Sequence, residues 1–364
     1  MNKKLIANVF TQAVEANGDF FDIDMISSEF YRLLNVAYVD VVKYIGKIKK
    51  VNLLFSGGRT SAYLVENTLQ LQSLGYFPDT EFIITYANTS REHKKTLEFI
   101  NNCDLRWREI YGNKVVWIEA VVHKGRLPCS HKVVSFNTAC RHGEVFEAVA
   151  AKYGLPNANF LHCTRELKEN PIMSYMESLG ERIGHIVKGD LVNATYETWI
   201  GIRADEPKRL GGNKNGKQKK VYPLAEIIPW QSCKRFFNLI CDKLDVLDFW
   251  EDMPFDLGIP EHQGNCVDCH KKSKKKLNMV FNESPEAFSF SIKLDDNYSH
   301  VKPQVLSDGS TKQRKRHRGY QNTNELIATF DISAVNPKTY EEESGGCSES
   351  CNGFENNEAE ELST

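Results

Sequence analysis

The sequence predicts an α/β protein built on a parallel sheet. Three apolar, strand-like stretches, at residues 51–55, 81–87 and 115–121, alternate with stretches of helical spacing. Strands that alternate with helices indicate a parallel sheet with helices on both faces. In such sheets ligands bind beyond the carboxyl ends of the strands. The polar residues that follow each strand are therefore the first candidates for a functional site.

The turn after the first strand, Ser56-Gly57-Gly58-Arg59-Thr60-Ser61, has the composition of an anion-binding loop. Glycine lets the backbone turn tightly and approach a ligand. N–H groups at the start of the following helix attract negative charge. The loop lacks the third spaced glycine of the dinucleotide fingerprint and the Gly-Lys-Ser/Thr ending of the Walker loop. An ordinary glycine turn is the alternative interpretation.

Length and composition place the chain among globular proteins. It has 364 residues, a hydrophobic share of 41% and a formal charge of −2. We expect one large or two smaller domains, with no general attraction to nucleic acid or membrane. No apolar run approaches the ~20 residues that span a bilayer, and the N-terminus lacks a signal-peptide pattern. We expect a cytoplasmic protein whose ten cysteines are buried thiols or ligands, not disulfides.

Four segments are expected along the chain. They are a helical N-terminal extension (1–48), an α/β nucleotide-binding domain (49–230), a helical Cys-x-x-Cys region (231–332) and an acidic, disordered tail (333–364). A helix is expected over residues 232–243, and the tail carries Cys347 and Cys351. Basic runs at 271–276 and 312–318 are expected to be solvated surface, with a path for a polyanion as the alternative.

Two further polar segments follow predicted strands. Asn88, Thr89 and Glu92 follow the second strand, and Glu92 is expected in the first helical turn, where an acid is favoured. A later strand ends in Gly201-Ile202-Arg203, and Asp205, Glu206 and Arg209 come next. Arg203 can bind a phosphate or sulfate through two parallel hydrogen bonds. A surface ion pair with Asp205 or Glu206 is the alternative.

Five segments in this order resemble the 3'-phosphoadenylyl sulfate (PAPS) reductase and PP-loop ATP pyrophosphatase superfamily, whose domain is adenine nucleotide alpha hydrolase-like. They are residues 56–61, 88–96, 163–171, 201–209 and 265–269. The chain also resembles reductase-like proteins of bacteriophage genomes and, more distantly, the sulfurtransferase of DNA phosphorothioation. Ser90 stands where the family has glycine, and the Glu-Cys-Gly-x-His pattern of the reductases is absent.

The resemblance implies roles for particular residues. An adenine nucleotide would be bound by Ser56, Gly57, Gly58, Thr60, Ser61, Asn88, Thr89 and Glu92. Negative charge that develops during cleavage would be stabilised by Arg59, Lys168, Arg203 and Arg209. A 4Fe-4S cluster would be held by Cys163, Cys266 and Cys269. Zinc is the main competitor, followed by a redox dithiol and plain buried thiols. The fourth ligand stays open among Cys129, Cys140, Cys233, His270 and none.

Two reactions fit the resemblance. In the first, a thiol attacks the sulfur of an adenylyl sulfate, and reduction releases sulfite. Cys347 or Cys351 would be that nucleophile. In the second, ATP with Mg²⁺ adenylates an acceptor, such as a nucleic acid or a nucleotide, and sulfur displaces AMP. Thr60 stands where ATP-cleaving members usually have Asp. A non-catalytic nucleotide-binding module is the third hypothesis. ATP versus PAPS and monomer versus homo-oligomer stay open, and no membrane partner is expected.

Overall fold

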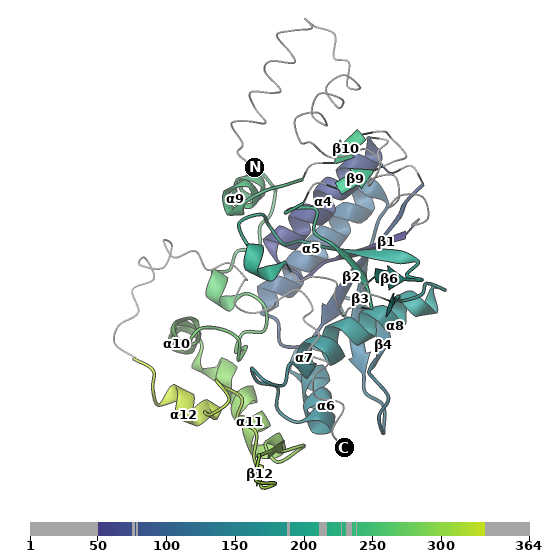
Figure 1. Ribbon diagram of the computed structural model, residues 1–364. Coiled ribbons are helices and arrows are strands. Elements are labelled where there is room, and N and C mark those ends of the chain that lie inside the picture. The colour runs from purple at the N-terminus through teal and green to yellow at the C-terminus, as the bar shows by residue number, and fades with distance from the viewer. Residues whose placement is uncertain are drawn as a thin grey trace, which may run out of the picture.

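A computed structural model of the chain describes residues 50–331, apart from 75–76, 78, 188–189, 211–216, 227, 231–234 and 238. The expected N-terminal helical extension, Cys233 and the acidic tail with Cys347 and Cys351 lie outside the described residues. Figure 1 shows the described part as a central sheet covered by helices, with a group of helices from the end of the chain beside it.

Six strands form the central sheet in the order β4-β3-β2-β1-β7-β8. The strands are β1 (Lys50–Leu54), β2 (Glu81–Asn88), β3 (Val115–Val121), β4 (Ser130–Val134), β7 (Tyr196–Ile200) and β8 (Lys219–Val221). All neighbouring pairs are parallel except β3 and β4, which are antiparallel. The α/β class and the mostly parallel sheet are therefore confirmed, with β4 as one antiparallel edge strand.

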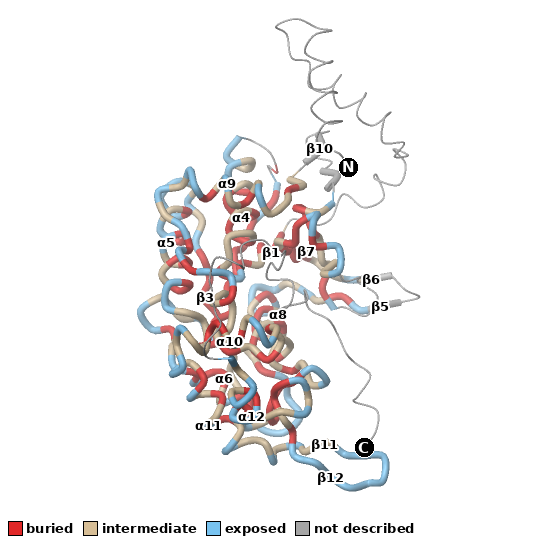
Figure 2. The backbone as a smooth tube through the Cα atoms, turned by 90° about the vertical axis from the view of Figure 1, so that its left-hand side faces the viewer, coloured by how far each residue is buried: buried red, intermediate tan, exposed pale blue. Residues whose placement is uncertain are grey.

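Helices cover both faces of this sheet. On one face lie α4 (Arg59–Ser73), α5 (Lys94–Tyr111) and α9 (Lys243–Glu251), and on the other lies α8 (Asn170–Ser178). Successive strand residues point to opposite faces, so Ile84 and Tyr86 of β2 pack in the cluster under α4 and α5. Ile83 and Ala87 pack with α8. Figure 2 shows that the buried residues follow the strands and the inner sides of these helices.

The second half of the chain adds small elements around the sheet. Two hairpins, β5 (His185–Val187) with β6 (Asp190–Val192) and β9 (Ile228–Trp230) with β10 (Arg235–Phe237), precede α9. The helix expected over 232–243 is wrong, because residues 235–237 are a strand and the helix begins at Lys243. The side chain of Asp242 caps that start by accepting from the backbone of Leu244 and Asp245.

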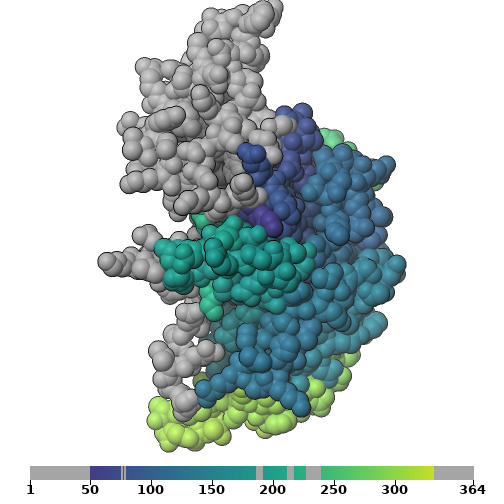
Figure 3. Space-filling model, turned by 90° about the vertical axis from the view of Figure 1, so that its right-hand side faces the viewer, coloured from purple at the N-terminus to yellow at the C-terminus, as the bar shows by residue number. Residues whose placement is uncertain are grey.

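The last described segment is helical. It contains α10 (Lys274–Glu283), α11 (Ser289–Tyr298), the short β11 (Gln304–Val305) and β12 (Thr311–Lys312), and α12 (Thr323–Ile327). Figure 3 shows this segment at one end of the molecule, next to the blue segments around β4 and α6 (Glu144–Tyr153). Within the described ranges, no helix combines the length and apolar character needed to cross a bilayer.

Candidate functional site

The loop after β1 depends on its first glycine. Gly57 has φ +80°, a left-handed conformation that L side chains rarely adopt. A Cβ at Gly57 would lie 2.7 Å from Cδ1 of Ile100 and 3.0 Å from Cγ2 of Thr96, both on α5. Gly58 then caps α4 with extended backbone angles. The loop is thus a tight turn that aims the first N–H groups of a 15-residue helix at the carboxyl edge of the sheet.

Serine hydroxyls hold the loop together. The Oγ of Ser61 accepts from the backbone N–H of Ser56 at 3.1 Å and donates to the carbonyl of Gly58 at 2.9 Å. The two serine hydroxyls lie 2.9 Å apart, and Ser56 is exposed while Ser61 is buried. Ser61 therefore maintains the turn, while Ser56 offers a hydroxyl to a ligand outside.

Three polar strand ends meet at one edge of the sheet, as the sequence predicts. Because β2, β1 and β7 are parallel neighbours, the segments 88–92, 56–61 and 201–203 follow adjacent strand ends. The contact between the last two is close. A Cβ at Gly201 would lie 2.9 Å from Cα of Ser61 and 3.1 Å from the carbonyl oxygen of Thr60. Only glycine lets the end of β7 approach the loop after β1 so closely.

Arg203 is buried at this edge and contacts the loop. Its Nη1 donates to the hydroxyl of Thr60 at 3.0 Å. The guanidinium also pairs with Asp205 at 2.8 Å and with Glu206 at 3.6 Å. The ion pairs that were the alternative interpretation are therefore present, but Arg203 is only 6% exposed and is not a surface residue. Its guanidinium therefore places a positive charge against the first turn of α4, which contains Thr60.

Two other predicted cations are held by carboxylates. Arg59 forms a two-bond ion pair with Asp256, with Nε 2.6 Å from Oδ1. Arg209 donates to Glu206 at 2.7 Å. That these two arginines stabilise negative charge on a bound nucleotide stays a prediction. In the structure, Arg59 connects α4 to Asp256, and Arg209 forms an ion pair with the buried Glu206.

The turn after β2 is built by its own side chains. Asn88 is fully buried and donates to Glu119 and to the carbonyl of Cys140, both at 2.8 Å. Ser90 adopts φ +63°, the left-handed conformation that the family's glycine would adopt without strain. Its hydroxyl accepts from the backbone of Val145 at the start of α6, at 3.1 Å. Ser90 therefore maintains the turn that glycine would form, and its hydroxyl in addition binds a backbone N–H at the start of α6.

Glu92 lies before α5 and not in its first turn. The helix begins at Lys94 with His93 as its cap, so the expected position of Glu92 is corrected by two residues. Its carboxylate accepts from the hydroxyl of Thr89 at 2.7 Å and from the backbone N–H groups of Thr89 and Arg91. Glu92 thus orders the turn that leads from the sheet edge to Cys266, with which it forms a backbone bridge.

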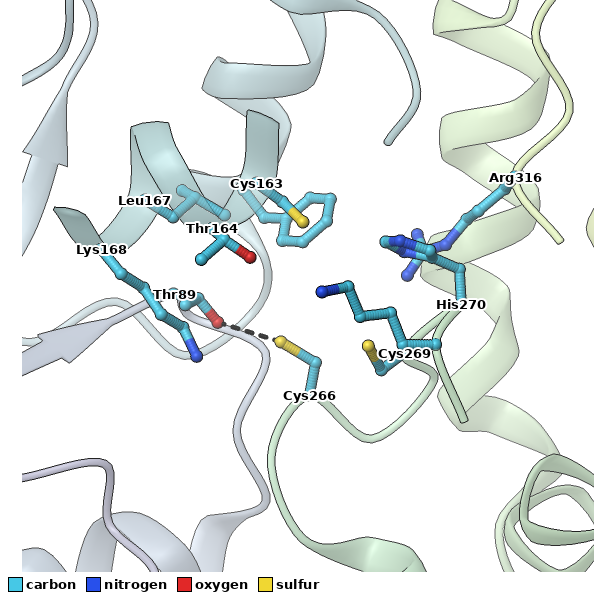
Figure 4. A pocket seen from close by; sticks show the side chains of 11 residues that line it. Thr89, Cys163, Thr164, Leu167, Lys168, Cys266, Cys269, His270 and Arg316 are labelled. Atoms are coloured by element: carbon cyan, nitrogen blue, oxygen red, sulfur yellow. Dashed lines mark hydrogen bonds between the residues drawn. The ribbon is translucent and has the colours of Figure 1, made fainter. Parts of the chain in front are cut away.

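All three predicted cysteine ligands line one cavity of ≈30 Å³. Cys163 belongs to the short α7 (His162–Thr164), which continues into a π-helix, η1 (Arg165–Glu169), that carries Lys168. Such π segments occur frequently at functional sites. Cys266 and Cys269 come from the loop before α10. Figure 4 shows Cys163 on one wall and the other two thiols facing it, with Lys168 and Thr89 beside them.

Two side chains with buried nitrogen atoms that lack a hydrogen-bond partner also line this cavity. His270 is 5% exposed and Arg316 is 1% exposed. The Nε2 of His270 and the Nε and Nη1 of Arg316 are buried without a hydrogen-bond partner. Cys129 and Cys140, which were other candidates for a fourth ligand, are not among the residues that line it. Of the described candidates, His270 alone shares the cavity with the three thiols.

A buried carboxylate positions the Cys-x-x-Cys segment. Asp268 is fully buried, pairs with Arg91 at 3.1 Å and lies 3.7 Å from Arg316. Although burial opposes ionisation, these two cations lower the pKa of Asp268 well below its usual range. Desolvation, with the charges of Glu92 and Cys269, raises the pKa of the Cys266 thiol to about 12. Without a metal, Cys266 is therefore a neutral thiol at pH 7, and a metal must displace its proton.

The basic runs are not simply solvated surface, which corrects that expectation. Lys272, Arg314 and Arg316 are 2%, 9% and 1% exposed. Lys272 donates to the carbonyls of His262 and Val267 at 2.6 Å and 2.9 Å. Sequence reasoning missed Arg316, Asp268 and Arg91 as parts of the cysteine site. Arg91 immediately precedes Glu92, and Asp268 lies inside the Cys-x-x-Cys motif, but Arg316 has no local signal.

Fold and site together define an α/β protein with a mostly parallel sheet, whose glycine loop, arginine-bearing strand end and three-thiol cavity lie on the side of the carboxyl edge. The chain belongs to the family of the uncharacterized nin region protein ORF290 of Escherichia phage lambda. The two are 30% identical over 313 residues, which cover 82% of this chain and 93% of the relative. This agrees with the expected resemblance to bacteriophage proteins. No family model matches the chain.

A solved structure that matches the chain weakly is the U34-tRNA thiolase NcsA from Methanococcus maripaludis with its [4Fe-4S] cluster. The identity is 14%, the alignment covers 82% of this chain and 88% of the thiolase, and the TM-score is 0.30. A TM-score this low does not indicate a common fold.

Proposed function

We propose that this protein is a PP-loop-type enzyme that binds ATP at residues 56–61 and transfers sulfur by means of the three-cysteine cavity. The observation that carries the proposal is the path between the two parts. The loop follows β1, the segment of Thr89 and Glu92 follows the adjacent β2, and Thr89 and Glu92 both contact Cys266. A nucleotide-type loop and three convergent thiols are therefore joined through one turn.

At the loop, the chain's groups would bind and orient the phosphates. The N–H groups at the start of α4 provide donors, and the Ser56 hydroxyl is accessible. Arg203 places a buried positive charge against Thr60, where it would favour the negative charge that develops as the phosphate bond breaks. Glu206 and Asp205 hold that guanidinium in place.

Three thiols that line one cavity are a donor set suited to an iron–sulfur cluster. In the described ranges, no three His, Cys, Asp or Glu side chains are close enough to hold one ion. A tetrahedral zinc with bonds of about 2.3 Å would need thiolates less than about 4 Å apart. In a cluster each thiolate binds a different iron, so wider spacing is required. Thiolates are the usual cluster ligands, and a bound cluster would supply sulfur-carrying chemistry to the adenylated acceptor.

A sulfonucleotide reductase is the second function that would use the same loop. It requires a nucleophilic thiol near the nucleotide, and the cysteines expected for this part, Cys347 and Cys351, lie outside the described residues. The described part favours sulfur transfer because its three cysteines line one cavity instead of lying dispersed.

Metal analysis of the full chain purified without oxygen tests the proposal. We expect brown protein with about four iron atoms and about four acid-labile sulfides per chain, and strong loss of both in Cys266→Ser. Cys140→Ser is the matched control, because Cys140 is half-buried nearby but does not line the cavity, and it should retain the iron. Colourless protein with stoichiometric zinc would remove the sulfurtransferase assignment.

A further inference from the structure

The three-cysteine cavity contains an imidazole nitrogen that no protein group satisfies. Nε2 of His270 is buried without a partner, and the side chain is 5% exposed. A buried polar atom without a hydrogen bond is destabilising, and a ligand bound at Nε2 would remove that cost. Figure 4 shows His270 entering the cavity from the side of the C-terminal helices, across from Cys163.

Arg316, which carries a full positive charge, also has buried nitrogen atoms without a hydrogen-bond partner. Its Nη2 donates to the carbonyl of Asp268 at 3.2 Å, but Nε and Nη1 have no partner. Asp268 is shared with Arg91, so this carboxylate does not use up the donors of Arg316. A guanidinium that is 1% exposed and has two nitrogen atoms without a hydrogen-bond partner is suited to a buried anion. The thiolate and sulfide sulfur atoms of an iron–sulfur cluster carry such negative charge.

Building on the proposed function, we propose that His270 is the fourth iron ligand of the centre held by Cys163, Cys266 and Cys269, and that Arg316 donates hydrogen bonds to its sulfur atoms. In the neutral imidazole with its proton on Nδ1, the Nε2 lone pair is free to bind iron. No electron transfer accompanies this binding, and the three thiol protons pass to solvent.

His270 differs from the other candidates for the fourth ligand, Cys129 and Cys140, because it lines the cavity. Cys129 and Cys140 do not line the cavity. The backbone N–H of Cys129 donates to Glu166, and that of Cys140 donates to Glu119, so both chain segments are fastened to other carboxylates. His270, in contrast, directly follows Cys269, and the loop that presents the two thiols therefore presents the imidazole as well.

The test uses the full chain labelled with ¹⁵N-histidine, reconstituted anaerobically with equal amounts of ferric and ferrous iron and with sulfide, and then reduced by one electron. Electron–nuclear double resonance should show a ¹⁵N coupling that is lost in His270→Ala. His262→Ala is the matched control: His262 is also buried, at 6% exposure, but it contacts Glu283 instead of the cavity, and its loss should leave the coupling unchanged. Thermal unfolding of each metal-free variant shows whether the chain is folded.

The outcomes separate this inference from the proposed function. Iron uptake without a ¹⁵N coupling, or a coupling that persists in His270→Ala, overturns the fourth ligand and leaves the sulfurtransferase proposal standing. Absence of iron uptake in the wild-type chain overturns both.

Arg316 has its own measurement. Because a cation beside the centre favours the more negative reduced state, Arg316→Gln should lower the midpoint potential, and Arg316→Lys should restore part of the shift. An unchanged potential in Arg316→Gln would show that the guanidinium only supports Asp268.

Discussion

The hydroxyl of Thr89 lies 3.4 Å from Sγ of Cys266, although the two residues are 177 positions apart in the chain. Thr89 follows β2, whose neighbour β1 leads into the glycine loop. Its hydroxyl also donates to Glu92 at 2.7 Å. The contact connects the carboxyl edge of the sheet directly to the cysteine cavity, which Thr89 and Cys266 both line. The turn after β2 therefore connects the two parts of the proposed site, the glycine loop and the cysteine cavity.

Close packing at Gly201 should stabilise the fold. In Gly201→Ala the new methyl would meet backbone atoms of Ser61 and Thr60 at 2.9–3.1 Å, which cannot move aside as a flexible side chain can. We expect the free energy of unfolding to fall by about 1–3 kcal/mol in urea denaturation. Gly58→Ala is the control, because its Cβ would meet only Oγ of Ser56 at 3.7 Å. Equal losses in both variants would contradict this packing.

The charge of Asp268 should stabilise the segment that carries the cysteines. Asp268→Asn leaves Arg91 and Arg316 without their shared carboxylate, and breaking a buried ion pair costs about 3–5 kcal/mol. The lowered pKa means that this contribution is present above the ordinary carboxyl pKa and is lost as the pH falls below it. Thermal unfolding at pH 7 measures the loss, and Asp308→Asn, at an exposed position, should show no change.

Glu169 should make the protein more stable in mild acid. Burial raises the pKa of its carboxyl from 4.5 to about 7, although Lys220, Arg165 and Lys217 oppose the shift. A raised pKa means that the stabilisation is complete below the unfolded value and is lost as the pH rises through the folded value, a difference of about 3 kcal/mol.

Unfolding free energies measured between pH 4.5 and 7 test this expectation. In Glu169→Gln the decline across that range should largely disappear, whereas Glu177→Gln, an exposed residue of α8, should keep it. A wild-type profile that rises toward pH 7 through this window would argue against a buried, protonated Glu169.

Local patterns were sufficient for most of the fold. Apolar, strand-like stretches identified β2 and β3 with their bounds close to those observed, and Gly57 and Gly58 marked the strand-to-helix turn. The helix expected over 232–243 failed because its apolar residues also suit the strand at 235–237, while the cap at Asp242 sets a later start. Glu92 was misplaced in the first helical turn because α5 begins only at Lys94, with His93 as its cap.

The site was predictable only where its residues lie in short motifs. Cys163, Cys266 and Cys269 were selected from motif resemblance, and they line one cavity. The burial of Arg316 could not be predicted, because it depends on Asp268, 48 residues earlier in the chain. Arg59 and Arg209 have the composition of anion binders, yet Asp256 and Glu206 bind them. Asp256 is 197 positions from Arg59 and leaves no local pattern, whereas Glu206 lies only three residues before Arg209.

Titration calorimetry of Mg²⁺ with ATP into the full chain tests the nucleotide loop most directly, with PAPS titrated in parallel. We predict ATP binding that weakens at least about tenfold, or about 1.4 kcal/mol, in Ser61→Ala, because the hydroxyl that holds Ser56 and Gly58 is lost. Ser73→Ala, at the exposed far end of α4, should bind like the wild type. No heat with either nucleotide, or equal affinities in all three proteins, would contradict a nucleotide site at this turn.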